Sequence, residues 1–282
     1  MTTTATSPTT AAPGGSASGV ISDSLVIAWR NLKRIPRVPE LLLYGTIQPI
    51  MFVLLFAYVF GGAISVEGSN DPALYREFLV GGIFAQTMTF AVASSSVGLA
   101  DDMQRGLIDR FRSLPIARSA VISGRVIGDL VFNSFVLLVL VLCGLAVGWR
   151  WHNGLLQAMA AMAILLGLTF AMLWIGALIG LSVRSAEVAS SAGLIWLFPL
   201  SFISSCFVDP STMPEWMQPI AEWNPISVVA SAVRELCGNP NPFASDGFQS
   251  QHPVLLSWIY IVAIVAVFAP LAVRKYGRAT AR

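Results

Sequence analysis

The chain has 282 residues and a formal net charge of +2; 55% of its residues are hydrophobic and only 11% are charged. Soluble domains carry about 25% charged residues, so this composition excludes a water-soluble globular protein and predicts one embedded in a membrane. The three cysteines are odd in number and lack C-x-x-C spacing, which indicates neither a disulfide framework nor a metal site.

The N-terminal region divides into two parts. Residues 1–19 consist almost entirely of Thr, Ala, Ser, Pro and Gly, and such a segment buries too little apolar area to order, so we expect a disordered cytoplasmic tail. Residues 20–34 place Leu25 and Trp29 on one helical face. Basic residues gather at the end of this segment, namely Arg30, Lys33 and Arg34. The pattern is typical of a helix that lies in the membrane interface.

Six later stretches are apolar and long enough to cross a bilayer core about 30 Å thick as helices. They cover about 41–63, 78–100, 126–148, 155–181, 188–208 and 254–273. We therefore predict an all-α integral membrane protein with six transmembrane helices, in which residues 20–282 form a single transmembrane domain.

The lysines and arginines predict the orientation of these spans. If both termini lie in the cytoplasm, the outer segments hold only Arg76, Arg150 and Arg234 of the 17 basic residues. This asymmetry predicts a multi-pass protein of the bacterial plasma (inner) membrane with both termini cytoplasmic.

The loop after the second span, residues 101–125, combines charge with an apolar stripe. The stripe consists of Met103, Leu107, Phe111 and Leu114. Asp101 or Asp102 can cap a short helix here, and Pro115 ends it. A helix this charged lies either on the membrane surface or in the groove of a partner protein. A solvated basic loop that only sets the topology is the alternative.

The outer segment before the last span predicts two short amphipathic helices. Trp216 and Trp223 are seven residues apart in the first. Asn224 as cap and Pro225 as first residue start the second, and Gly238 is a suitable stop.

Several functional groups are missing from the sequence. It holds no G-x-x-x-x-G-K-[ST] phosphate loop, no evident nucleophile and base, and no charge at the middle of a span. We therefore expect a chain that is not an enzyme and takes its energy from a partner. Asp129, one turn inside the third span, is expected to pair with Arg125.

Uncharged polar residues do occur within the spans. They are Gln48, Gln86, Thr87, Thr89 and Asn133, and they either line a path or bond between helices. The run Ser94 to Ser96 is expected to allow tight packing between helices.

The order of these parts, together with residues 105–125 and 214–238, resembles the type-2 ABC export permeases, and most closely the daunorubicin-resistance branch of drug and lipid exporters. The resemblance implies a permease subunit of an ATP-driven exporter that moves a hydrophobic or amphipathic compound out of the cell. It implies as partners two copies of an ATP-binding subunit that holds ATP and Mg, a second permease copy or a paralogue, and membrane lipid, but no nucleic acid and no cofactor in this chain.

The resemblance also implies two functional regions. A coupling helix that receives the stroke of the ATPase would contain Gly106, Asp109, Arg110, Leu114 and Pro115, which match the family motif, and, from charge, stripe and placement, Arg105, Phe111 and Arg112. An outer gate would contain Pro214, Trp216, Trp223, Asn224, Pro225 and Arg234. The substrate would pass between the two permease copies. A polysaccharide or glycolipid export permease and a non-transport membrane scaffold are the alternative readings.

Overall fold

The computed structural model describes residues 39–59, 71–105, 118–245 and 247–279. The described part of the chain is helical and contains no β-strand. Its long helices are α2 (Pro39–Val59), α3 (Pro72–Thr89), α4 (Ala91–Gln104), α6 (Arg118–Ala146), α7 (Leu155–Gly180), α8 (Ala186–Phe202), α10 (Pro225–Cys237) and α12 (Pro253–Ala279). Short helices are η2 (Pro210–Thr212), α9 (Gln218–Glu222) and α11 (Phe248–Gln251).

Four helical stretches are long and apolar enough to cross a membrane. They are Pro72–Gln104, Ala120–Ala146, Leu155–Gly180 and Pro253–Arg278, and they correspond to the predicted second, third, fourth and sixth spans. The predicted first and fifth spans coincide with shorter apolar helices, Gly45–Val59 and Ala186–Phe202. The fifth was predicted to continue to residue 208, but the helix ends at Phe202, three residues after Pro199, which lies in its last turn.

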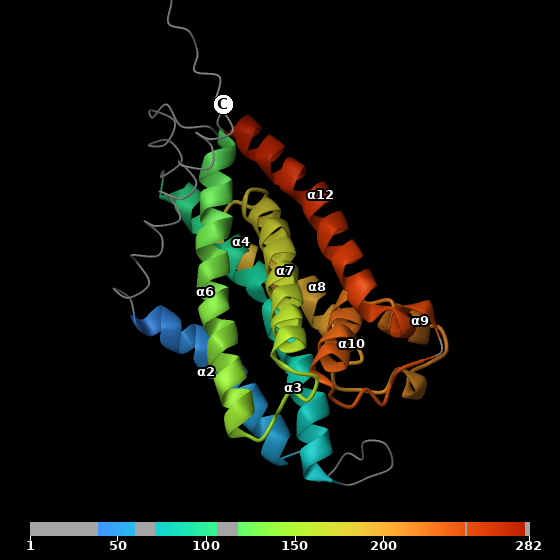
Figure 1. The fold of residues 1–282 in the computed structure, drawn as a ribbon. Coiled ribbons are helices and arrows are strands. Elements are labelled where there is room, and N and C mark those ends of the chain that lie inside the picture. The colour runs from blue at the N-terminus through green and yellow to red at the C-terminus, as the bar shows by residue number, and fades with distance from the viewer. Residues whose placement is uncertain (1–38, 60–70, 106–117, 246, 280–282) are drawn as a thin grey trace, which may run out of the picture.

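Helix α7 is the centre of the bundle, with α6 and α12 packed on different sides of it (Figure 1). It approaches α4 closely because Gly176 and Gly180 face that helix. A Cβ atom at Gly176 would lie 2.5 Å from the carbonyl oxygen of Val92. The predicted serine packing is confirmed, since Ser95 Oγ donates to the carbonyl oxygen of Leu173 at 3.2 Å. Small residues thus let these two backbones meet, as they do in membrane bundles generally.

Helix α10 starts and stops as predicted but does not lie on the surface. Asn224 caps it by accepting from the Ile226 N–H at 2.9 Å, and Gly238 follows it in the left-handed conformation with φ 70°. Most of its residues are buried against α3, α7 and α12. The expected amphipathic outer helix is therefore a helix inserted into the bundle. An apolar helix face can pack against protein or against lipid. Sequence periodicity therefore could not tell a helix inside the bundle from one on the membrane surface.

The short helix predicted for the loop after the second span does not start at Asp101 or Asp102. Asp101 and Asp102 lie in the last turn of α4, which continues to Gln104, rather than at a new helix start. Arg105 directly follows that helix. The other proposed coupling residues, Gly106, Asp109, Arg110, Phe111, Arg112, Leu114 and Pro115, lie outside the described residues, and so do Leu25, Trp29, Arg30, Lys33 and Arg34.

Candidate functional site

A cavity of about 380 Å³ lies between α2, α3, α4, α6 and α8. Four of the five predicted intramembrane polar residues line its wall, namely Gln48, Gln86, Thr87 and Asn133. The fifth, Thr89, is fully buried elsewhere and donates to the Ala85 carbonyl oxygen at 2.8 Å. Four of these residues therefore line a cavity, and one of the four, Gln86, also bonds between helices, whereas Thr89 bonds only within its own helix.

Aromatic rings form much of the remaining wall. They are Phe52, Phe90, Phe132, Phe198 and Phe202. The rings of Phe90 and Phe198 meet edge to face with centroids 5.8 Å apart, and Phe198 stacks on Phe202 at 6.3 Å. None of the described residues that line the cavity is charged. The cavity can therefore hold an uncharged apolar surface and offer it a few hydrogen bonds.

Hydrogen bonds fix two of the amide side chains on this wall. Gln86 Nε2 donates to Ser201 Oγ at 2.5 Å, which ties α3 to α8. Asn133 Nδ2 donates to the main-chain carbonyl oxygen of Asp129 at 2.8 Å, within α6. The cavity wall is thus polar at defined positions rather than uniformly apolar.

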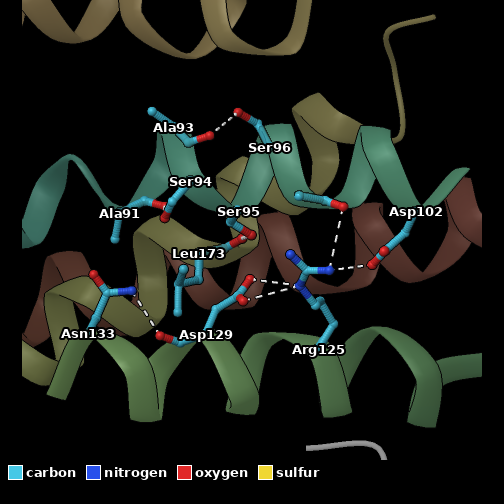
Figure 2. A network of polar contacts seen from close by, with 11 residues as sticks. Ala91, Ala93, Ser94, Ser95, Ser96, Asp102, Arg125, Asp129, Asn133 and Leu173 are labelled. Atoms are coloured by element: carbon cyan, nitrogen blue, oxygen red, sulfur yellow. Dashed lines mark hydrogen bonds and ion pairs between the residues drawn. The ribbon is translucent and has the colours of Figure 1, made fainter. Parts of the chain in front are cut away.

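An ion cluster lies where α4 ends and α6 begins (Figure 2). The predicted pair is confirmed, since Arg125 Nε lies 3.1 Å from both carboxylate oxygens of Asp129. Arg125 Nη1 also donates to the carboxylate of Asp102 on α4 and, at 3.4 Å, to the carbonyl oxygen of Gly98. Gly98 makes this reach possible, because a Cβ atom there would overlap the guanidinium.

Sequence reasoning missed the partner on α4. Asp102 lies 23 residues from Arg125, so no helical spacing relates the two residues. The available signal was topological, since consecutive antiparallel spans bring the end of one beside the start of the next.

A fully buried cation lies at the opposite end of the bundle. Arg234 is fully buried on α10 and donates to the carbonyl oxygens of Phe78, Ser205 and Cys206 at 3.0, 3.2 and 3.2 Å. Its guanidinium carbon lies 3.9 Å from the centre of the Phe78 ring. Gly82 leaves room for the guanidinium of Arg234, since a Cβ atom at this position would lie 3.0 Å from Arg234 Nη2.

These bonds satisfy backbone that has left the helical form after α8. Asn224 Nδ2 donates to the carbonyl oxygens of Leu200 and Ile203, both at 2.6 Å. Ser227 Oγ accepts from the Ser205 N–H at 2.9 Å. Buried backbone outside a helix needs such hydrogen-bond partners, and α10 with its cap Asn224 supplies them.

The predicted outer-gate residues therefore fall into two groups. Asn224, Pro225 and Arg234 belong to α10 and its contacts with the end of α8. In contrast, Pro214, Trp216 and Trp223 flank α9 and are exposed, with 70% of Trp216 and 48% of Trp223 accessible. Tyr260 Oη donates to the carbonyl oxygen of Trp223 at 2.9 Å, which ties this second group to α12.

Comparison with known proteins shows which family the chain belongs to. Residues 23–237 match the family described as ABC-2 type transporter. The chain is 34% identical to the daunorubicin resistance ABC transporter permease protein DrrB1 of Streptomyces coeruleorubidus, over 91% of this chain and 86% of that protein. It is 24% identical to the probable doxorubicin resistance ABC transporter permease protein DrrC of Mycobacterium tuberculosis, over 92% and 90%. The chain therefore belongs to the ABC-2 type transporter family, because the family match covers most of the chain and DrrB1 is similar to it along most of both lengths.

Proposed function

We propose that this chain is the permease of an ATP-driven exporter that moves a hydrophobic or amphipathic compound, such as a drug, antibiotic or lipid, out of the cell. The observation that carries the proposal is the uncharged cavity between α2, α3, α4, α6 and α8, with its aromatic rings and fixed amides. Its volume of about 380 Å³ falls in the range of about 300 to 1,000 Å³ that holds drug-sized molecules.

The names of two relatives support the same class of cargo. DrrB1 and DrrC are described as daunorubicin and doxorubicin resistance permeases. A polysaccharide or glycolipid exporter would need aromatic residues at intervals along a path, whereas here they cluster around one cavity. The alternative of a scaffold without transport activity does not account for a cavity with polar groups held in place by hydrogen bonds.

The proposal includes six membrane crossings, with α2 as the first and α8 as the fifth. Helix α2 has 21 residues, and a rise of 1.5 Å per residue gives it a length of about 30 Å. Helix α8 has 17 residues and would reach about 25 Å, and residues 203–208 with their hydrogen bonds to α10 would complete the crossing. The asymmetry of lysine and arginine supports cytoplasmic termini in a bacterial plasma membrane.

The energy would come from two copies of a separate ATP-binding subunit, which would hold ATP and Mg. Residues 105–115 would receive its movement, and residues 20–34 would rest on the cytoplasmic membrane surface. Helix α10 and the exposed segment around Trp216 would form the outer gate. A second copy of this chain is the simplest partner, because two identical copies close a symmetric pair.

The cavity predicts how cargo binding responds to Phe198→Ala. The full chain is co-expressed with its ATP-binding subunit, and ATP-dependent daunorubicin uptake is measured in inverted membrane vesicles. Removing a ring whose side chain packs between Phe90 and Phe202 should raise the half-saturating concentration about threefold to tenfold. Phe135→Ala is the matched control, because Phe135 is an exposed α6 ring that does not line the cavity.

Two outcomes would contradict this picture. Equal behaviour of the two variants would show that the cavity does not bind the cargo. Absence of ATP-dependent uptake by the unaltered complex, with daunorubicin and with a panel of other amphipathic drugs and lipids, would refute drug and lipid export itself.

A further inference from the structure

The ion cluster of Asp102, Arg125 and Asp129 plays no part in the cavity wall and needs its own explanation. Its side chains are only 17 to 21% exposed, and it joins two carboxylates to one guanidinium. Burying such a group costs several kcal/mol per ion, and well-packed apolar side chains often stabilise as well or better. Stability alone is therefore a weak reason for these residues.

The position of the cluster is more informative than its energy. Helix α4 packs mainly on α7 and α8, while α6 packs mainly on α7 and α2. The side chain of Arg125 reaches from α6 across to Asp102 and Gly98 on α4. The cluster is thus a polar connection between two helices whose apolar faces are mostly engaged elsewhere.

Both connected helices also carry the cavity wall. On α6, Asp129 lies one turn from Asn133, and its main-chain carbonyl oxygen accepts a hydrogen bond from the Asn133 side chain at 2.8 Å. On α4, Gly98 lies one turn from Ser94, which lines the same cavity. Figure 2 shows Asp102, Arg125, Asp129 and Asn133 in one continuous row from the end of α4 to the cavity residues.

We infer that the Asp102–Arg125–Asp129 cluster is the joint that carries a displacement of the end of α4 to the cavity wall on α6. Asp102 and Arg125 are then positioning residues for transport and touch neither cargo nor nucleotide. This inference rests on the proposed ATP-driven function, because the displacement would come from the ATP-binding subunit. The cluster suits the task, since an ion pair holds two helix ends in register in one geometry and can release them in another.

The test measures whether nucleotide on the partner changes the cavity. Ser94→Cys places a thiol on the exposed cavity wall, in the full chain with its three native cysteines replaced by alanine. The complex with its ATP-binding subunit is reconstituted in lipid nanodiscs. Maleimide alkylation of Cys at 94 is timed without nucleotide and with a non-hydrolysable ATP analogue. We expect at least about a fivefold difference in rate, the lower end of typical allosteric coupling.

Asp102→Asn should abolish that difference while co-purification of the ATP-binding subunit and thermal stability remain unchanged. Asp102→Glu should restore it, because the carboxylate is kept. Asp101→Asn is the matched control, since Asp101 is the neighbouring residue and, among the residues that the structure describes, its carboxylate pairs with Arg105 at 2.9 Å. Its rates should match those of the parent.

The outcomes separate the inference from the proposed function. A nucleotide effect that survives Asp102→Asn overturns the inference alone. Loss of partner binding or of thermal stability in Asp102→Asn also overturns it, because the cluster would then be structural. A parent complex whose alkylation rate does not change with nucleotide overturns the inference as well. The proposed function fails separately, if the same parent complex shows no ATP-dependent uptake.

Discussion

The guanidinium of Arg234 bonds to carbonyl oxygens from two separate segments, α3 and residues 205–206. Its planar fork can serve several acceptors at once, whereas an ammonium is a compact charge on a flexible stem. Each buried acceptor left without a donor costs about 1 to 3 kcal/mol. The residue therefore holds the non-helical backbone after α8 in place.

Arg234→Lys should lower the free energy of unfolding by about 2 kcal/mol. Thermal unfolding of the purified chain in detergent, followed by tryptophan fluorescence, measures this loss. Arg150→Lys is the control, because Arg150 is exposed and its guanidinium donates to the carbonyl oxygens of Leu145 and Trp149, which are close to it in the chain. Its effect should stay within about 0.5 kcal/mol. Equal stability of both variants would mean that Arg234 does not hold the segment.

Among the helices, the contact between α4 and α7 depends most on small residues. The backbones meet at Gly176 and Gly180, opposite Val92 and Ser96. Ser96 also donates from its Oγ to the carbonyl oxygen of Ala189 on α8 at 3.2 Å. Because α4 carries one end of the ion cluster and part of the cavity wall, its distance from α7 sets the geometry of both.

Gly176→Val should destabilise the bundle by about 1 to 3 kcal/mol, because the added side chain cannot fit against the Val92 carbonyl oxygen without moving α4. The same detergent unfolding assay measures this change. Ala163→Val places an identical side chain at an exposed position of the same helix, so it controls for the helix propensity of valine. Similar unfolding of the two variants would contradict the tight contact.

At the scale of the whole molecule, the proposed exporter is incomplete without an ATP-binding subunit. We expect the apolar stripe after α4 to anchor that subunit, so a charge on the stripe should be costly to bury. Leu114→Asp should reduce co-purification of the ATP-binding subunit more than about tenfold, while membrane insertion stays normal. Ser113→Asp, which adds the same charge beside the stripe, should leave co-purification intact. Normal pairing of Leu114→Asp would count against the coupling helix.

Local features of the sequence were sufficient for much of this fold. Apolar length located the four helices that are long and apolar enough to cross a membrane. Asn224, Pro225 and Gly238 marked both ends of α10. The i, i+4 spacing of Arg125 and Asp129 gave their ion pair. Each of these depends on neighbours within one or two helical turns, where geometry follows directly from the order of residues.

Only the tertiary structure decided which distant residues meet. It placed α10 inside the bundle, brought Asp102 to Arg125, and gathered Gln48, Gln86 and Asn133 around one cavity. An apolar helix face suits lipid and protein interior equally, so periodicity cannot say which one covers it. An uncharged amide likewise satisfies its hydrogen bonds within its helix or across a cavity, and the packing of neighbouring helices determines which.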